Sequence, residues 1–222
     1  MKFFPLRFPW ITATLASLFP AAWLLPSDDL EYDRARMAAG EVWRLVTGQL
    51  VHWTPRMAAL DVGMVIALGI WLELRGDRRR LVTSLALGAG LTALAVQTLS
   101  PDLLTYQGSS GLASALFVLA AVRIADTPER WPRTLAITAV VLFLSKAAFE
   151  SLAGQTLFAG PLPPGVHVVP LVHLLGGLGG LVATQKLMLP ELFKSCRVAA
   201  GLTLRGSPPP SVAIPLGKES AK

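Results

Sequence analysis

The chain has 222 residues, of which 53% are hydrophobic and only 15% charged, and its mean hydropathy is +0.54. This composition excludes an ordinary soluble domain, because too few polar residues remain to cover a surface in water. The net charge of +6 does not indicate nucleic-acid binding, because the basic residues lie between apolar runs, as in loops beside an anionic membrane leaflet. The single cysteine, Cys196, excludes an intramolecular disulfide and a CxxC metal site. We expect neither a metal nor a cofactor.

Apolar segments recur along the chain, and about 20 apolar residues are enough for a helix to cross a bilayer. The first segment does not end in the small-residue cleavage site of a signal peptide, so we interpret it as a retained helix. The fourth and fifth segments are short for a full span, and we expect them to extend into the flanking loops. The six segments cover residues 8–25, 57–74, 81–99, 110–124, 134–148 and 166–188.

These segments predict an all-α membrane protein with a six-helix bundle over residues 1–189. The remaining residues, 190–222, contain "SPPPS" and "GKESAK", which are typical of a largely disordered tail.

The charges of the loops predict the orientation of the bundle. Acidic residues dominate the loop after the first segment, and by the positive-inside rule both termini are then cytoplasmic. We therefore expect a multi-pass protein of the cell (inner) membrane whose site opens to the extracytoplasmic side. Arg34, Arg36 and Arg44 lie in the first outer loop and weaken this assignment without reversing it. The basic residues on the expected cytoplasmic side are Arg75, Arg78, Arg79, Arg80, Arg123, Arg130, Arg133, Lys186, Lys194 and Arg197.

A serine and a histidine are predicted to meet inside the bundle. The fourth and sixth segments both run from outside to inside, which places Ser110 at the outer end and His173 roughly 10 Å deep. An ionisable residue within a membrane helix is costly and indicates function. A serine hydroxyl becomes a nucleophile when a base lies within about 3 Å. His167 is the competing base, but the positions that follow it on the same face are not small.

Small residues accompany both members of this pair. Gly176, Gly177 and Gly180 follow His173 at spacings of three, four and seven, on the face of the histidine. Gly111 keeps one side of the fourth segment small, and small residues let membrane helices approach closely. The same pattern is common in membrane helices as a packing device, so the residues alone leave open whether Ser110 is a nucleophile or a packing residue.

The order of three motifs resembles an intramembrane rhomboid serine protease over residues 43–187. These are "WRLVTGQLVH", the GxSG sequence at residues 108–111, and "HLLGGLGG". Three finer matches are similar to the rhombosortase branch: "HWT" followed by Asp61, "GIWLE" ending in Glu73, and "KAAFESLAG" with Lys146 and Glu150.

The resemblance implies a Ser–His dyad with Ser110 as nucleophile and His173 as general base. It also implies a membrane-anchored protein substrate with a C-terminal transmembrane segment. In rhombosortases the implied substrates carry a Gly-Gly motif, an apolar helix and a basic end. Two rivals remain: a rhomboid-like protein that binds transmembrane clients without cutting them, and a small channel or transporter subunit with His173 as a proton relay.

The chain departs from the family pattern near the expected oxyanion. Rhomboids usually place a histidine and an asparagine on the second segment, where this chain has Met57 and Asp61, whereas His52 occupies the upstream histidine position. We expect the backbone N–H of Ser110, between Gly108 and Gly111, to serve the oxyanion.

Asp61 has two interpretations. A lone carboxylate in a membrane helix is costly when ionised, and a protonated Asp61 would donate a hydrogen bond to the oxyanion. The alternative is an ionised Asp61 paired with Arg44 or Arg56. Lys146 and Glu150, four residues apart on one helical face, are expected to form a local pair.

Overall fold

The computed structural model describes residues 8–164 and 166–185. The chain divides into two units, residues 1–185 and 186–222. The predicted tail, residues 190–222, and the last residues of the sixth predicted segment lie outside the described part. All that follows concerns the first unit.

A helix forms at each of the six predicted segments. Three of these helices are long and apolar enough to cross a membrane: α5, α8, and α6 together with a π-helical turn, η1, that continues it. The described chain is mostly helical, as the sequence predicts. The helices are α1 (Trp10–Trp23), α5 (Pro55–Leu74), α6 (Arg78–Leu94) with η1 (Ala95–Leu99), α7 (Ser110–Ala125), α8 (Arg130–Ala153) and α9 (Pro170–Thr184).

The expected extension of the two short segments is right for one of them and wrong for the other. α8 extends beyond the predicted segment at both ends and stops at Gly154, whose φ of 64° ends the helix in the left-handed conformation. α7 begins at Ser110 and gains nothing at its outer end. The reason is that Thr105–Tyr106 form a strand, β2, that pairs with another strand, and this pairing keeps the preceding backbone extended.

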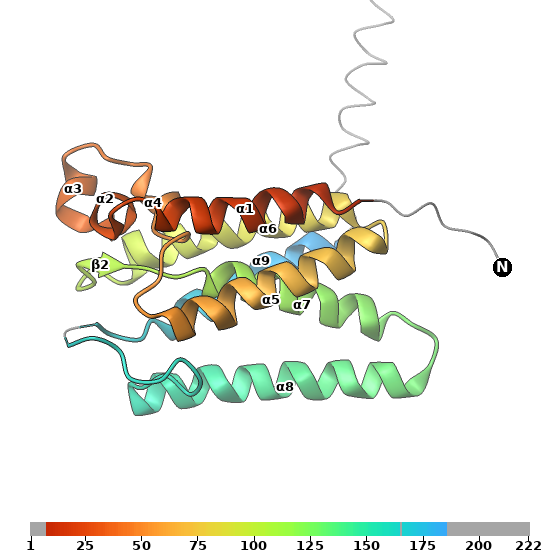
Figure 1. Ribbon diagram of the computed structural model, residues 1–222. Helices are drawn as coiled ribbons and strands as arrows, with labels where there is room; N and C mark the ends of the chain where they lie inside the picture. The colour runs from red at the N-terminus through yellow and green to blue at the C-terminus, as the bar shows by residue number, and fades with distance from the viewer. Residues whose placement is uncertain (1–7, 165, 186–222) are drawn as a thin grey trace, which may run out of the picture. The chain divides into compact units, whose positions relative to one another are not determined.

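The loop between α1 and α5 folds into short elements that the sequence did not predict. They are α2 (Ser27–Leu30), β1 (Tyr32–Asp33), α3 (Arg34–Ala38) and α4 (Arg44–Thr47). β1 pairs antiparallel with β2, so that Tyr32 lies opposite Tyr106. Figure 1 shows these elements at one end of the bundle, and the links α5–α6 and α7–α8 at the other end, where arginines lie in or beside the links.

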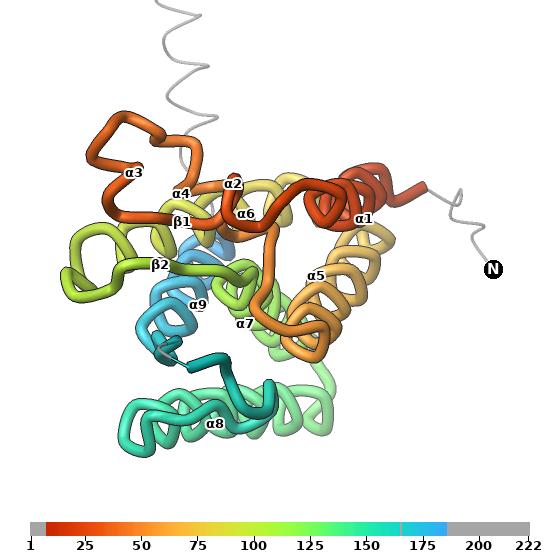
Figure 2. The backbone as a smooth tube through the Cα atoms, turned by 60° about the vertical axis from the view of Figure 1, so that its left-hand side comes forward, coloured from red at the N-terminus to blue at the C-terminus, as the bar shows by residue number. Residues whose placement is uncertain are grey.

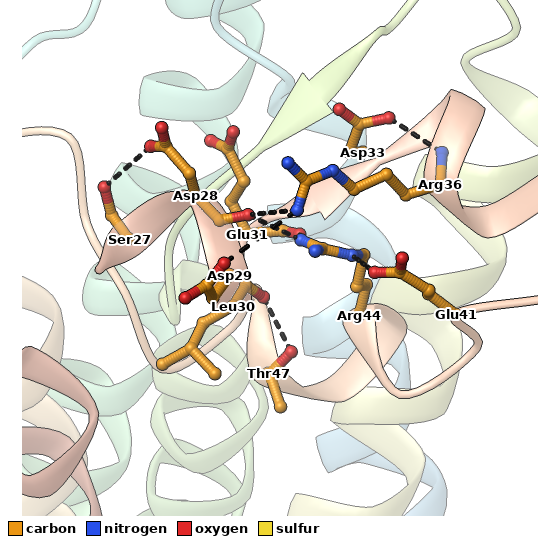
Figure 3. A network of polar contacts seen from close by, with 10 residues as sticks. All are labelled: Ser27, Asp28, Asp29, Leu30, Glu31, Asp33, Arg36, Glu41, Arg44 and Thr47. Carbon is orange, nitrogen blue, oxygen red and sulfur yellow. Dashed lines mark hydrogen bonds and ion pairs between the residues drawn. The ribbon is translucent and has the colours of Figure 1, made fainter. Parts of the chain in front are cut away.

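Arg44 holds this loop together. Its side chain is 2% exposed and donates to Glu41 Oε2 at 2.6 Å and to the carbonyl oxygens of Asp28 at 2.9 Å and Glu31 at 2.8 Å. The Thr47 hydroxyl donates to the carbonyl oxygen of Leu30 at 2.6 Å. Figure 3 shows these contacts converging on the short helices. Arg44 is therefore a buried structural residue, which explains how a basic residue fits within the acidic loop.

Glycines allow α9 to pack closely against α6 and α7. A Cβ built on Gly176 would collide with the carbonyl oxygen of Gly111, and one on Gly180 would collide with that of Ala115. Gly179, which the sequence analysis did not single out, lies against α6, where a Cβ would be 2.8 Å from the Gly88 nitrogen. Figure 2 shows α9 beside α7, with α8 on the far side of both from α1. The small face predicted after His173 is thus a contact between helix backbones.

Glu73 joins α1 to α5 at the end of the bundle opposite the short helices. Its side chain is fully buried, and its Oε2 accepts from the backbone N–H of Thr12 at 2.7 Å and from the Thr12 hydroxyl at 2.8 Å. Arg78 lies 3.4 Å from Oε1 of the same carboxylate. The carboxylate is therefore compensated by hydrogen bonds and a cation, as a buried charge must be.

Candidate active site

The chain reaches Ser110 through a position that requires glycine. The N–H of Gly108 donates to the carbonyl oxygen of Gly48 at 3.0 Å, and Gly108 has a φ of 139°, which residues with a side chain rarely adopt. A Cβ on Gly108 would also lie 2.6 Å from Cε of Met57. α7 then begins at Ser110 without a side-chain cap. The N–H groups of its first turn are therefore available to an anion.

Ser110 and His173 line one cavity of about 690 Å³. The cavity lies between α5, α7, α8 and α9, and its wall is mostly apolar. His167, the competing base, is exposed on the loop before α9 and does not line the cavity. The polar groups that line it are Asp61 of α5, Ser110 and Ser114 of α7, Ser145, Lys146 and Glu150 of α8, Thr156 of the following loop, and His173 of α9.

His173 faces α7 one turn below Ser110. Its Nδ1 is 3.3 Å from Oγ of Ser114, which lies four residues after Ser110 and hence on the same helical face. Among the described residues no hydrogen bond joins Ser110 to His173. The Tyr106 phenol lies near the Ser110 hydroxyl and donates to the carbonyl oxygen of Gly108 at 3.0 Å. Burial raises the pKa of Tyr106, which keeps it a neutral donor.

His52 supports the residue that precedes Ser110. Its Nε2 accepts the backbone N–H of Ser109 at 3.2 Å and lies 3.0 Å from Oγ of Ser109. Burial lowers the pKa of His52 to about 4, so the ring is neutral at physiological pH. A neutral imidazole that accepts at Nε2 carries its proton on Nδ1. His52 therefore holds the loop that presents Ser110.

Asp61 lies beside the same loop. Its Oδ2 is 3.7 Å from Nε2 of His52, and a Cβ on Gly108 would also be 3.7 Å from it. Since His52 is neutral, this contact is not an ion pair, and Oδ2 is buried without a hydrogen-bond partner among the described residues.

The predicted alternative, an ionised Asp61 paired with an arginine, is wrong for Arg44. Its guanidinium binds Glu41 and two backbone carbonyl groups in the loop between α1 and α5. In the part of the chain that the structure describes, Arg56 does not form an ion pair with Asp61 either. Asp61 thus places a carboxyl oxygen without a hydrogen-bond partner, among the described residues, beside Gly108.

The packing glycines differ in what an added Cβ would meet: backbone atoms at Gly176 and Gly180, and side chains at Gly111 and Gly177. Gly111 permits the approach of α6, because a Cβ there would collide with the Thr92 side chain, and it also receives Gly176 of α9. Gly177 faces side chains, since its Cβ would lie 3.2 Å from Cγ2 of Val118. Gly111 therefore acts on the site through helix packing.

Two connections in the site were missed from sequence. Tyr106 begins the stretch that contains GxSG, but nothing in its spacing shows that its hydroxyl lies beside Ser110. Lys146 and Glu150 form the predicted pair, with 2.6 Å between Nζ and Oε2. Their contact with His173 was not predicted, because it joins two helices. The signal that was available is the position of both charges within an apolar helix.

The sequence matches the family model of the Rhomboid domain over residues 39–189. The chain belongs to the rhomboid family. The matched region begins directly after α3, continues through α9 and includes Ser110 and His173, so the predicted resemblance to rhomboids is confirmed. No curated protein and no solved structure matches the chain. This rhomboid domain, with its apolar helices of membrane-spanning length, makes the chain an integral membrane protein. The narrower assignment to the rhombosortase branch stays a prediction.

Proposed function

We propose that this rhomboid protein is an intramembrane serine endopeptidase, with Ser110 as nucleophile and His173 as general base. The observation that carries the proposal is that both residues line one cavity, with Ser110 at the uncapped start of a helix. A channel or transporter subunit would need neither feature. Covalent labelling of Ser110 by a fluorophosphonate probe tests the proposal, because neither a binding protein nor a channel subunit would react.

The proposed reaction follows from these positions. His173 takes the proton of the Ser110 hydroxyl while Oγ attacks the substrate carbonyl carbon, and it returns that proton to the leaving amine. Water then hydrolyses the acyl-enzyme by the same exchange of protons. The backbone N–H of Ser110 stabilises the oxyanion. His173 contacts Ser114, which lies one turn after Ser110 on the same face of α7. The step therefore requires the His173 ring to move from Ser114 toward Ser110.

The proposed substrates are membrane proteins with a C-terminal transmembrane anchor, cleaved near a Gly-Gly signal. Supporting this class, the apolar wall of the cavity suits a helix leaving the bilayer, and its hydrophobic side chains include Leu142, Phe143 and Phe149 of α8. The residues next to Ser110 are small, as Ala113 and Ser114 are, which favours small substrate residues at the cut.

A second candidate function is a rhomboid-like protein that holds transmembrane clients without cleaving them. Two observations favour it: Ser110 has no hydrogen bond to His173 among the described residues, and Met57 stands where the family has a polar donor. Catalytic hydrogen bonds often tighten only when substrate binds, so the first observation is compatible with both functions. Probe labelling separates the two.

We further propose six membrane spans with both termini cytoplasmic and the cavity open to the extracytoplasmic side. In a Cys196→Ser background, Ser27→Cys and Leu104→Cys are expected to react with an impermeant thiol reagent added outside intact cells. Glu129→Cys is expected to react only after the membrane is permeabilised. All three positions are exposed, and Leu104 is 70% exposed, so protection would report sidedness rather than burial. External labelling of Glu129→Cys would overturn the orientation.

Asp61 is proposed to be a protonated hydrogen-bond donor to the oxyanion. Asp61→Ala is then expected to slow probe labelling by roughly 10²-fold, the effect of losing one oxyanion donor. Asp61→Asn keeps a donor and is expected to retain activity. The wild-type rate should fall as rising pH ionises Asp61, since a carboxylate repels the oxyanion, and Asp61→Asn should remove that decline. An unchanged rate in Asp61→Ala would show that the backbone alone serves the oxyanion.

A further inference from the structure

His173 contacts a charged pair on α8 that a Ser–His dyad does not use. Nε2 of His173 lies 3.4 Å from Oε2 of Glu150 and 3.3 Å from Nζ of Lys146. Glu150 is only 2% exposed, and its side chain is fixed at both oxygens: Oε1 accepts from the backbone N–H of Leu157 at 2.9 Å, and Oε2 from Lys146 at 2.6 Å. A carboxylate held in this way has a defined position beside the imidazole.

The two neighbours of Nε2 favour opposite tautomers of His173. If Nε2 carries the proton, it donates to Glu150, and Nδ1 presents a lone pair toward α7, where Ser114 and Ser110 lie. If the Lys146 ammonium donates to Nε2, the proton must be on Nδ1, and the side that faces α7 is no longer a base. General-base chemistry at Ser110 therefore requires the tautomer that Glu150 stabilises.

We propose that Glu150 is the positioning residue of His173, so that the site works as a Ser110–His173–Glu150 relay rather than a dyad. The inference rests on the proposed protease function. Lys146 anchors the carboxylate and also competes with it for Nε2. When the Ser110 proton moves to Nδ1, the imidazolium keeps its Nε2 proton and Glu150 stays ionised beside it. The proton then passes from Nδ1 to the leaving amine, and His173 and Glu150 return to their starting states.

The remaining charged and titratable groups around His173 do not duplicate this role. Asp61 lines the cavity from α5, but its described contact within 4 Å is with His52, and it forms no ion pair with Lys146 in the described part of the chain. Tyr106 on β2 donates to Gly108. His167, on the loop before α9, is exposed. Among the described residues, Glu150 is the carboxylate that contacts Nε2. A purely structural Lys146–Glu150 pair would stabilise α8 without holding the tautomer of His173 that general-base chemistry needs.

The test measures the rate of fluorophosphonate labelling of Ser110 against pH, using the full chain in detergent. Glu150→Gln is expected to slow labelling by roughly 10²- to 10⁴-fold, because an amide that donates to Nε2 holds the wrong tautomer. It should also move the acid limb of the profile to lower pH, since the imidazolium loses its counter-charge. Glu150→Asp should restore part of the rate. Lys146→Met should move the acid limb to higher pH, because it removes a cation next to the imidazolium.

Glu73→Gln is the matched control. It also removes a buried carboxylate from a membrane helix, but Glu73 binds Thr12 and does not line the cavity. It is expected to lower thermal stability and leave the pH profile unchanged. If wild type labels at Ser110 but neither the Glu150 nor the Lys146 variants move the acid limb, the relay is overturned while the protease function stands. If wild type does not label at all, both fail. If Glu150→Gln does not fold, Glu150→Asp decides, because it draws the carboxylate back from Nε2, and labelling at the wild-type rate in this variant would overturn the relay.

Discussion

Ser110→Ala is expected to abolish fluorophosphonate labelling and the cleavage of a membrane-anchored substrate, while the protein stays folded. Alanine removes the only proposed nucleophile, and helices tolerate it well, so α7 and its packing against α9 should persist. The nearby Tyr106 phenol keeps its bond to the Gly108 carbonyl oxygen. The measurements are probe labelling in membranes, the amount of cleaved substrate, and the melting temperature of the purified protein.

Ser109→Ala is the matched control for this substitution. The Ser109 side chain is fully buried and points to His52, away from the cavity, and the backbone N–H that also binds His52 remains in the variant. We expect a labelling rate within about tenfold of wild type, because the variant loses roughly one hydrogen bond that positions the loop. Cleavage by Ser110→Ala at the wild-type rate would refute the assignment of the nucleophile, and labelling lost only in Ser109→Ala would transfer it to Ser109.

The sequence was sufficient to predict the helices, because their apolar stretches are local and long. It also predicted similar depths for Ser110 and His173, because depth in a membrane helix follows from counting residues, and both residues line one cavity, although His173 contacts Ser114 rather than Ser110. The first residue of a helix and the fold of a long loop were harder to predict from the sequence. The start of α7 depends on the pairing of Tyr106 with Tyr32, which are far apart in the chain. The folding of residues 27–47 depends on one buried arginine, Arg44, whose partners are mostly backbone carbonyl groups that no sequence pattern displays.

The chemistry around His173 was predictable only in part. Spacing of four on a helix pairs Lys146 with Glu150, but it does not say which neighbouring helix receives the pair. That depends on how α8 is rotated about its axis and on the loop at Leu157, which binds Glu150. The partner of Asp61 was equally hard to predict. Asp61 lies beside His52 and Arg44 binds Glu41 because of how the loop before α5 folds, which the sequence pattern does not display.

Gly176→Ala and Gly180→Ala are expected to reduce probe labelling by at least about 10²-fold and to lower stability by about 1–3 kcal/mol each. The added methyl group would collide with the backbone carbonyl oxygen of Gly111 in the first variant and of Ala115 in the second. Backbone cannot move aside as a side chain can, so α9 must shift away from α7. Because His173 lies one turn before Gly176, this shift displaces the base from Ser110. Labelling rate and melting temperature are measured on the same samples.

Three further glycines on this bundle separate the effect of contact from that of the substitution itself. Gly63 and Gly90 are helical glycines with no atom within 4 Å of an added Cβ, so alanine there should be neutral or slightly stabilising. Gly177→Ala should have an intermediate effect on labelling and stability, smaller than at Gly176 or Gly180 and larger than at Gly63 or Gly90. Its methyl group would meet Cγ2 of Val118 at 3.2 Å, a side-chain atom that can yield by a few tenths of an ångström. Wild-type labelling in Gly176→Ala would mean that α9 is free to move without cost, and the close approach of α7 and α9 would then not be what holds His173 beside Ser110.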